Sequence, residues 1–235
     1  LAEVLITLWI IGVVAAITIP SFIAKYQERV YISKIKKVYY TLDQAVRRAV
    51  DEHGPVDTWP IDPGNDMYLR GQEITQIILP YLDGVKICKW ENKMSSCFAP
   101  DYKYKTPTGG SSPIWPNKNT MFMLKDGASY SITSQNTSTW CTGKANDYAI
   151  DCGTITVDIT GSSGPNVAGK DYINFMLTKT GVMPSGRKGG YHTNSFEKGC
   201  LELFYNCSAW IIYNDNMDYL HCPEKLGWNK ASSCK

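Results

Sequence analysis

An almost uninterrupted apolar run opens the chain. Residues 1–24 carry a single charge, Glu3, and the next charge is Lys25. Roughly 20 apolar residues suffice for a helix that crosses a bilayer, so this run predicts a membrane-spanning helix. A cleaved secretory signal would show basic residues, a shorter apolar stretch and a small-residue cleavage site. We therefore expect this segment to stay in the mature protein.

Beyond Pro20 the helix is expected to continue to His53 with a different pattern. Apolar residues now recur at alternating spacings of three and four, which is typical of one buried helical stripe: Ile32, Ile35, Tyr39, Leu42, Val46 and Ala49. Basic residues lie off that stripe: Lys34, Lys36, Lys37, Arg47 and Arg48. Gly54-Pro55 ends the helix, because glycine suits the position after a helix and proline cannot continue it.

The remaining residues, 55–235, favour short strands over long helices. One short helix is expected within 67–84, and residues 120–124 and 128–132 flank an Asp-Gly turn that predicts a hairpin. Further strands are expected at 154–159 and 172–177, with 208–213 as a fifth. Residues 106–117, rich in Pro, Gly, Ser and Thr, predict a surface loop.

These elements predict an α+β fold, in which a long N-terminal helix packs on the antiparallel sheet of a disulfide-stapled head. The expected parts are an apolar helix half at 1–24, an amphipathic helix half at 25–54 and a globular head at 55–235.

Eight cysteines all lie in the head, and an even count outside the membrane indicates four disulfides in an oxidising compartment. Local pairing is favoured for Cys88 with Cys97 and for Cys141 with Cys152, because each pair closes a short loop. For the last four, Cys200 with Cys207 and Cys222 with Cys234 is preferred. A link between Cys207 and Cys222 remains the rival arrangement.

The first twenty residues, LAEVLITLWIIGVVAAITIP, resemble the N-terminal signature of type IV pilins and of the related type II secretion pseudopilins. Glu3, Gly12 and Pro20 stand where that superfamily has its glutamate, its helix-loosening glycine and its proline. Mature members usually begin with an N-methylated Phe followed by Thr. This chain starts at Leu1, so no residue here is assigned as the methylated terminus.

The resemblance implies that Glu3 docks subunits, by pairing with the free N-terminal amine of a neighbouring copy. An unpaired carboxylate in an apolar bundle carries a large free-energy penalty, so such a pair would set the axial register. The simpler alternative is that Glu3 reaches the lipid headgroups as the end residue of a plain anchor.

Gly12 and Pro20 mark a segment that is weak as helix. Proline removes a backbone donor and glycine has low helix propensity, so the residues between them are expected to unwind locally in a packed filament. In lipid, unwinding would expose peptide groups at a cost of several kcal/mol each, as an order of magnitude. A simple kink at Pro20 is the alternative for the isolated subunit.

Residues 157–171 form an oxygen-rich loop between two expected strands. The loop contains Asp158, Thr160, Asn166 and Asp171, and such loops can hold calcium. The loop also resembles a glycine-rich segment of pseudopilin-like ectodomains, some of which bind calcium, although Thr160 replaces the usual Asn. Turn chemistry alone also explains these residues. Beyond calcium, no cofactor is expected.

Catalysis and nucleic-acid binding find little support. The chain has three histidines and no nucleophile elbow, phosphate-binding loop or metalloprotease helix, so we expect no enzyme activity. The net charge is +2, and the basic residues of the helix alternate with acidic ones. Nucleic acid is therefore not the expected primary partner.

The expected function is that of a structural pilin subunit that polymerises helically into an extracellular type IV filament for adhesion, motility or surface contact. Its implied partners are further copies of itself, the pilus assembly or secretion machinery, and the inner membrane before assembly. Two alternatives stay open: a pseudopilin of a type II secretion system, and a monomeric membrane-anchored ectodomain that binds a ligand.

Overall fold

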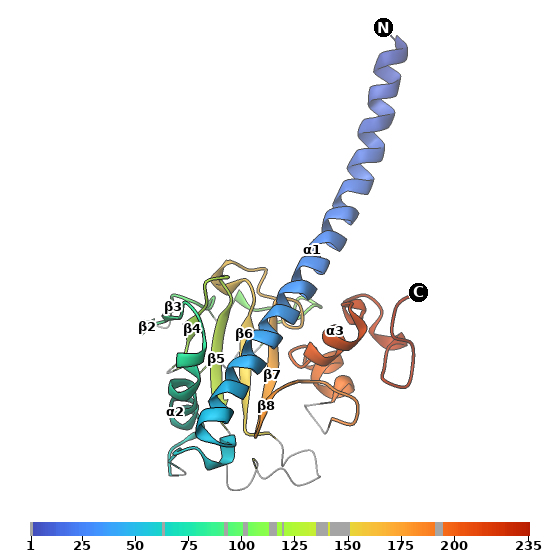
Figure 1. Cartoon of the computed structure of the whole chain (residues 1–235). Helices are drawn as coiled ribbons and strands as arrows, with labels where there is room; N and C mark the ends of the chain where they lie inside the picture. The colour runs from blue at the N-terminus through green and yellow to red at the C-terminus, as the bar shows by residue number, and fades with distance from the viewer. Residues whose placement is uncertain are drawn as a thin grey trace.

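A computed structural model describes residues 2–62, 64–91, 94–100, 103–112, 117–118, 120–134, 141, 151–190 and 195–235. Figure 1 shows a long N-terminal helix that rises out of a globular head, with its C-terminal half lying across a sheet. This arrangement of a long apolar helix packed on an antiparallel sheet is pilin-like, and it confirms the predicted α+β fold.

The long helix, α1, spans Ala2–His53 and contains Pro20 without a break in the helix. It ends where the sequence predicts, because Gly54 adopts a positive φ of 82° and its N–H donates to the carbonyl of Val50 at 2.9 Å. A residue with a side chain would be strained in that left-handed conformation, so glycine terminates the helix at low cost.

Six strands form one antiparallel sheet in the order β1-β4-β5-β6-β7-β8. Their bounds are β1 Lys86–Ile87, β4 Phe122–Met123, β5 Ser129–Ser134, β6 Gly153–Asp158, β7 Tyr172–Thr178 and β8 Gly181–Pro184. Strands β2 (Trp90–Glu91) and β3 (Met94–Ser95) pair separately. The expected Asp-Gly hairpin is confirmed as β4–β5, in which Phe122 opposes Tyr130 and Gly127 has a φ of 82°.

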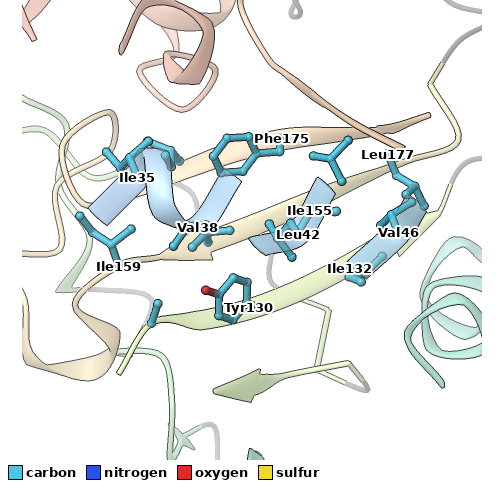
Figure 2. Close-up of a cluster of buried hydrophobic side chains, with 14 of the residues drawn as sticks. Ile35, Val38, Leu42, Val46, Tyr130, Ile132, Ile155, Ile159, Phe175 and Leu177 are labelled. Carbon is cyan, nitrogen blue, oxygen red and sulfur yellow. The ribbon is translucent and has the colours of Figure 1, made fainter. Parts of the chain in front are cut away.

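The main core lies between α1 and this sheet. The buried stripe of α1 presents Ile35, Val38, Leu42 and Val46 to the side chains of three strands, as Figure 2 shows. The facing residues include Tyr130, Ile132, Ile155, Phe175 and Leu177. Full burial of one such side chain contributes about 1.5–3 kcal/mol, so this interface fixes the helix on the head.

A second helix, α2 (Met67–Ile78), lies beside β5 and confirms the helix expected within 67–84. Asp66 caps it by accepting hydrogen bonds from the N–H groups of Tyr68 and Leu69. Gly71 lies so close to β5 that an added Cβ would stand 2.3 Å from the carbonyl oxygen of Ile132. Glycine is therefore required there for the helix to reach the sheet.

The prediction of a strand at 208–213 is wrong, because these residues form the helix α3 (Ser208–Asn214). The Ser208 hydroxyl accepts the N–H of Ser185 at 2.8 Å, and the N–H of Ala209 donates to the carbonyl of Ser185 at 2.9 Å. The first residues of α3 thus bond the backbone just beyond β8. Trp210 and Ile211 are buried side by side because α3 also contacts α1 and β7.

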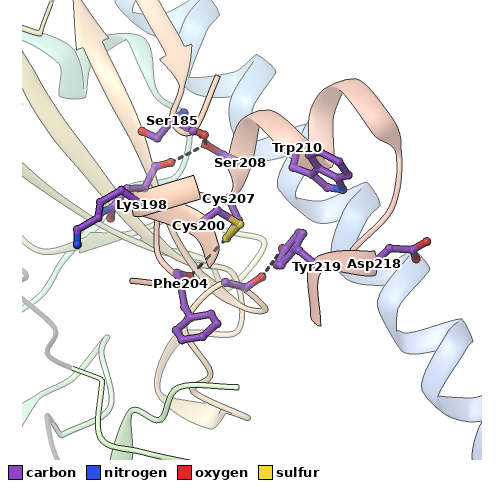
Figure 3. Close-up of a disulfide and its surroundings, with 12 residues drawn as sticks. Ser185, Lys198, Cys200, Phe204, Cys207, Ser208, Trp210, Asp218 and Tyr219 are labelled. Carbon is purple, nitrogen blue, oxygen red and sulfur yellow. Dashed lines mark hydrogen bonds between the residues drawn. A yellow bond between two sulfur atoms is a disulfide. The ribbon is translucent and has the colours of Figure 1, made fainter. Parts of the chain in front are cut away.

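Four disulfides join Cys88 to Cys97, Cys141 to Cys152, Cys200 to Cys207 and Cys222 to Cys234. They are the pairs preferred from the sequence, and the rival link between Cys207 and Cys222 is absent. Figure 3 shows Cys200–Cys207, which ties a π-helix at Phe196–Glu202 to the start of α3. Short 3-10 turns complete the described chain at Val56–Thr58, Leu79–Tyr81, Gly161–Ser163, Asp218–Leu220 and Pro223–Lys225.

Candidate assembly segment and buried acidic site

The N-terminal part of α1 makes no core with the head. Its large apolar side chains from Val4 to Ile23 are 41–73% exposed. Within the described residues, one helix is long and apolar enough to cross a membrane, and none of its most apolar stretch is buried against the head. An exposed apolar surface of this size needs lipid or protein to cover it.

Glu3 lies in the first turn of this exposed segment. Its side chain is exposed, and it makes no ion pair with any residue that the structure describes. The proposed pairing with a neighbouring copy therefore stays a prediction.

Gly12 and Pro20 lie on the same segment, where α1 remains helical through both. A Cβ built on Gly12 would meet no atom within 4 Å, so nothing near it in the described structure requires a glycine. Figure 1 shows the helix curving gently without a sharp kink. The unwinding expected in a filament concerns another state of the protein and stays a prediction.

The loop between β6 and β7 brings two carboxylates together inside the head. Asp158 ends β6, Asp171 precedes β7, and both side chains are completely buried. The Thr160 hydroxyl lies 3.0 Å from Asp158 Oδ1 and 2.8 Å from Asp171 Oδ2. That hydroxyl has one proton, so it can donate to only one of the two carboxylates at a time.

The remaining contacts of the two carboxylates come from N–H and O–H donors. Asp171 accepts the N–H groups of Asn166 and Val167 at 2.7 and 2.6 Å. Asp158 accepts the N–H of Thr160 at 2.9 Å and the hydroxyl of Tyr104. These bonds tie the loop together between β6 and β7.

Burial, followed by the neighbouring charge of Asp171, raises the pKa of Asp158 to about 7. Burial also raises the pKa of Asp171 above its ordinary range. No basic side chain in the described part of the chain forms a salt bridge with either carboxylate. A proton or a bound cation would relieve the repulsion between them.

The donor set is of the right chemical kind for calcium. Calcium takes six to eight oxygen ligands, and the loop offers two carboxylates, the Thr160 hydroxyl and the side-chain carbonyl of Asn166. That carbonyl oxygen is buried and has no hydrogen-bond partner in the described structure. The described residues hold no cluster of three or more Asp, Glu, His or Cys that could hold a metal. Any calcium would thus depend on neutral oxygens as well as the two carboxylates.

The acidic site lies beside the upper part of the packed half of α1. The pKa of Tyr31, a residue of α1, is raised by burial and then by the charges of Asp171 and Asp158. Lys170 Nζ stands 5.9 Å from the centre of the Tyr31 ring. Tyr219, in the C-terminal part of the head, donates its hydroxyl to the carbonyl of Gly169 in the same loop (Figure 3).

Tyr104 and Tyr31 were not identified from the sequence. Tyr104 is 54 residues from Asp158, and no local pattern connects the two. Tyr31 lies outside the predicted stripe, and its closeness to the loop arises only when α1 packs on the sheet.

Comparison with known protein families, curated proteins and solved structures finds no match for this chain. The apolar helix and the disulfides indicate a protein that is membrane-anchored or secreted.

A pH and calcium experiment tests the acidic site. In chelator, we expect the free energy of unfolding to fall as the pH rises from 5 to 8. The folded protein binds an extra proton at Asp158 up to about pH 7, whereas the unfolded chain releases it near the ordinary value of 3.8. The stabilisation is complete below the pKa of Asp158 in the unfolded chain and is lost as the pH rises through its pKa in the folded protein. The free energy of unfolding therefore falls by about 3 kcal/mol between pH 5 and pH 8. Urea unfolding of the full-length protein in detergent micelles measures it.

The matched variant is Asp158→Asn, which keeps the shape and removes the titration. Its stability should change about 3 kcal/mol less than that of the wild type between the two pH values. At pH 8, calcium should stabilise the wild type and leave the variant unchanged. A wild-type pH profile parallel to that of Asp158→Asn contradicts the raised pKa, and equal responses to calcium in both proteins contradict the metal site.

Proposed function

We propose that this chain is a structural subunit that polymerises helically into an extracellular type IV filament. The observation that carries the proposal is the exposed apolar half of α1, which continues without a break into a half that is fixed on the head. A membrane can cover this surface before assembly, and further copies of the same surface can cover it in a filament. The rigid connection would let the packed helices hold the heads in a regular array.

Glu3 supplies the specificity in this proposal. A bundle held only by apolar contacts has weak axial register, because apolar contacts are not directional. A carboxylate inside such a bundle requires a charged partner, and the proposed partner is the N-terminal amine of a neighbouring subunit. Four disulfides suit a head that is exposed outside the cell, where no cytoplasmic reductant acts.

Electron microscopy of sheared fractions tests the proposal. The full chain is produced together with a type IV assembly system in cells that lack their own pilin, and antibodies against the head label the preparation. We expect long filaments that carry the label along their length. Label that stays in the membrane fraction, with no filaments, would instead identify a lone anchor or a pseudopilin that forms no long polymer.

A further inference from the structure

The outer face of the packed half of α1 is basic and exposed to solvent. Residues 25–50 contain seven basic and two acidic side chains. We define the basic stripe as the exposed positions Arg29, Lys34 and Lys37, because Arg47 and Arg48 lie within one helical turn of Asp51 and Glu52 in α1. Arg29 and Lys34 make no ion pair with the described residues, and Lys37 stays 67% exposed although Asp126 lies 3.5 Å away. This face of the helix is therefore available to a partner.

The opposite charge gathers at the far end of the head. Residues 51–66 contain five acidic side chains and no lysine or arginine. We define the acidic collar as these five: Asp51, Glu52, Asp57, Asp62 and Asp66. Figure 1 shows this segment, in cyan, at the end of the head opposite the protruding N-terminus.

Most of the acidic side chains of the collar are exposed at the surface without a basic partner among the described residues. Lys179 neutralises Asp57 at 2.6 Å, and the nearby Arg70 is buried. The other four acidic side chains are exposed and form no ion pair within the described structure.

The stripe and the collar are too far apart to neutralise each other within one molecule. Lys37 and Asp51 are fourteen residues apart on one helix, or about 21 Å at 1.5 Å per residue. Solvent screens exposed charges beyond about 8 Å at physiological ionic strength. Two copies side by side in register would place stripe near stripe and collar near collar, which is unfavourable. Two copies offset along α1 by a similar distance would bring opposite charges together.

We propose that the basic stripe of α1 is a docking surface for the acidic collar of a second copy that is displaced along the long axis. This inference rests on the proposed filament and names a head-to-head contact that the apolar bundle does not provide. The occupant is a second copy because the same chain supplies both charge patterns, at a separation that only a displaced neighbour can match. Charge complementarity of this kind selects the register and speeds the encounter.

Charge reversal with rescue tests this contact in the full chain, produced with the same assembly system. The stripe variant is Lys34→Glu with Lys37→Glu, and the collar variant is Asp51→Lys with Asp62→Lys. Within the described residues, Asp51 makes no side-chain hydrogen bond, and the Asp62 side chain accepts one N–H, from Gly64. We expect each variant to lower the filament yield in sheared fractions at least about tenfold. Combining all four substitutions should bring the yield back to within about threefold of the wild type.

The matched control is Lys225→Glu with Lys230→Glu, which makes the same charge change on exposed residues of the C-terminal part of the head. It should assemble like the wild type, and thermal melting of each protein in detergent should show that all variants fold. If the wild type forms filaments and the combined variant is no better than the single-surface variants, the docking surface is wrong and the filament stands. If the wild type forms no filaments, the proposed function fails and this inference fails with it.

Discussion

Replacing Glu3 by Ala is expected to leave the protein in the membrane and to remove it from filaments. The substitution makes the apolar segment more apolar, so insertion is retained. It also leaves the N-terminal amine of the neighbouring subunit without its carboxylate in the bundle, and breaking one side of a buried ion pair costs about 3–5 kcal/mol. A loss of that size per subunit is expected to abolish assembly. Immunoblots of membrane and sheared fractions measure both quantities in the same cells.

The control for this experiment is Thr7→Ala, four residues further along the same exposed segment. The Thr7 hydroxyl donates to the carbonyl of Val4 within its own helix, so removing it leaves no group unpaired. This variant should insert and assemble like the wild type. Wild-type yields of filament from Glu3→Ala would mean that Glu3 only reaches the headgroups, and the docking role would have to be abandoned.

The helix and its buried face could be predicted because their signals are local. Spacings of three and four residues place Ile35, Leu42 and Val46 on one side of any helix, whatever it packs against. All three are completely buried. The end at Gly54 was equally local, since it depends on one residue with a positive φ.

The C-terminal part of the head could not be predicted in this way. Residues 208–213 combine β-branched and aromatic side chains, which favour a strand in isolation. The fold makes them a helix because Ser208 bonds Ser185, and because the indole of Trp210 packs against the rings of Phe196 and Trp228. Similarly, the sequence predicts a surface loop that includes Asn117, yet Asn117 is completely buried and donates to the carbonyls of Tyr68 and Ile132.

The acidic site combines features that local sequence signals predict with features that depend on distant contacts. Asp158, Thr160, Asn166 and Asp171 lie within one short loop, and the structure brings the two carboxylates and Thr160 into contact as the loop sequence indicates. Their electrostatics depend on burial under Tyr104 and near Tyr31, which only the folded chain supplies. The chemical type of the site was therefore readable from the sequence, and the raised pKa of Asp158 was not.

Trp210→Ala is expected to be the most destabilising single substitution in the C-terminal part of the head. The Trp210 ring is completely buried, stacks on Phe196 with ring centres 4.2 Å apart, and lies 5.3 Å from Trp228. Its indole N–H donates to Asn216 Oδ1 at 2.9 Å, so truncation also leaves that acceptor with one bond fewer. Figure 3 shows the ring on α3, in the part of the head that the Cys200–Cys207 disulfide holds. A cavity of this kind costs about 3–5 kcal/mol.

The control is Tyr213→Ala, which removes an aromatic ring from the same helix. The Tyr213 side chain is 63% exposed, so its loss should cost less than about 1 kcal/mol. Urea unfolding of the full-length protein in detergent compares the two, and similar losses in both variants would contradict a core organised around Trp210.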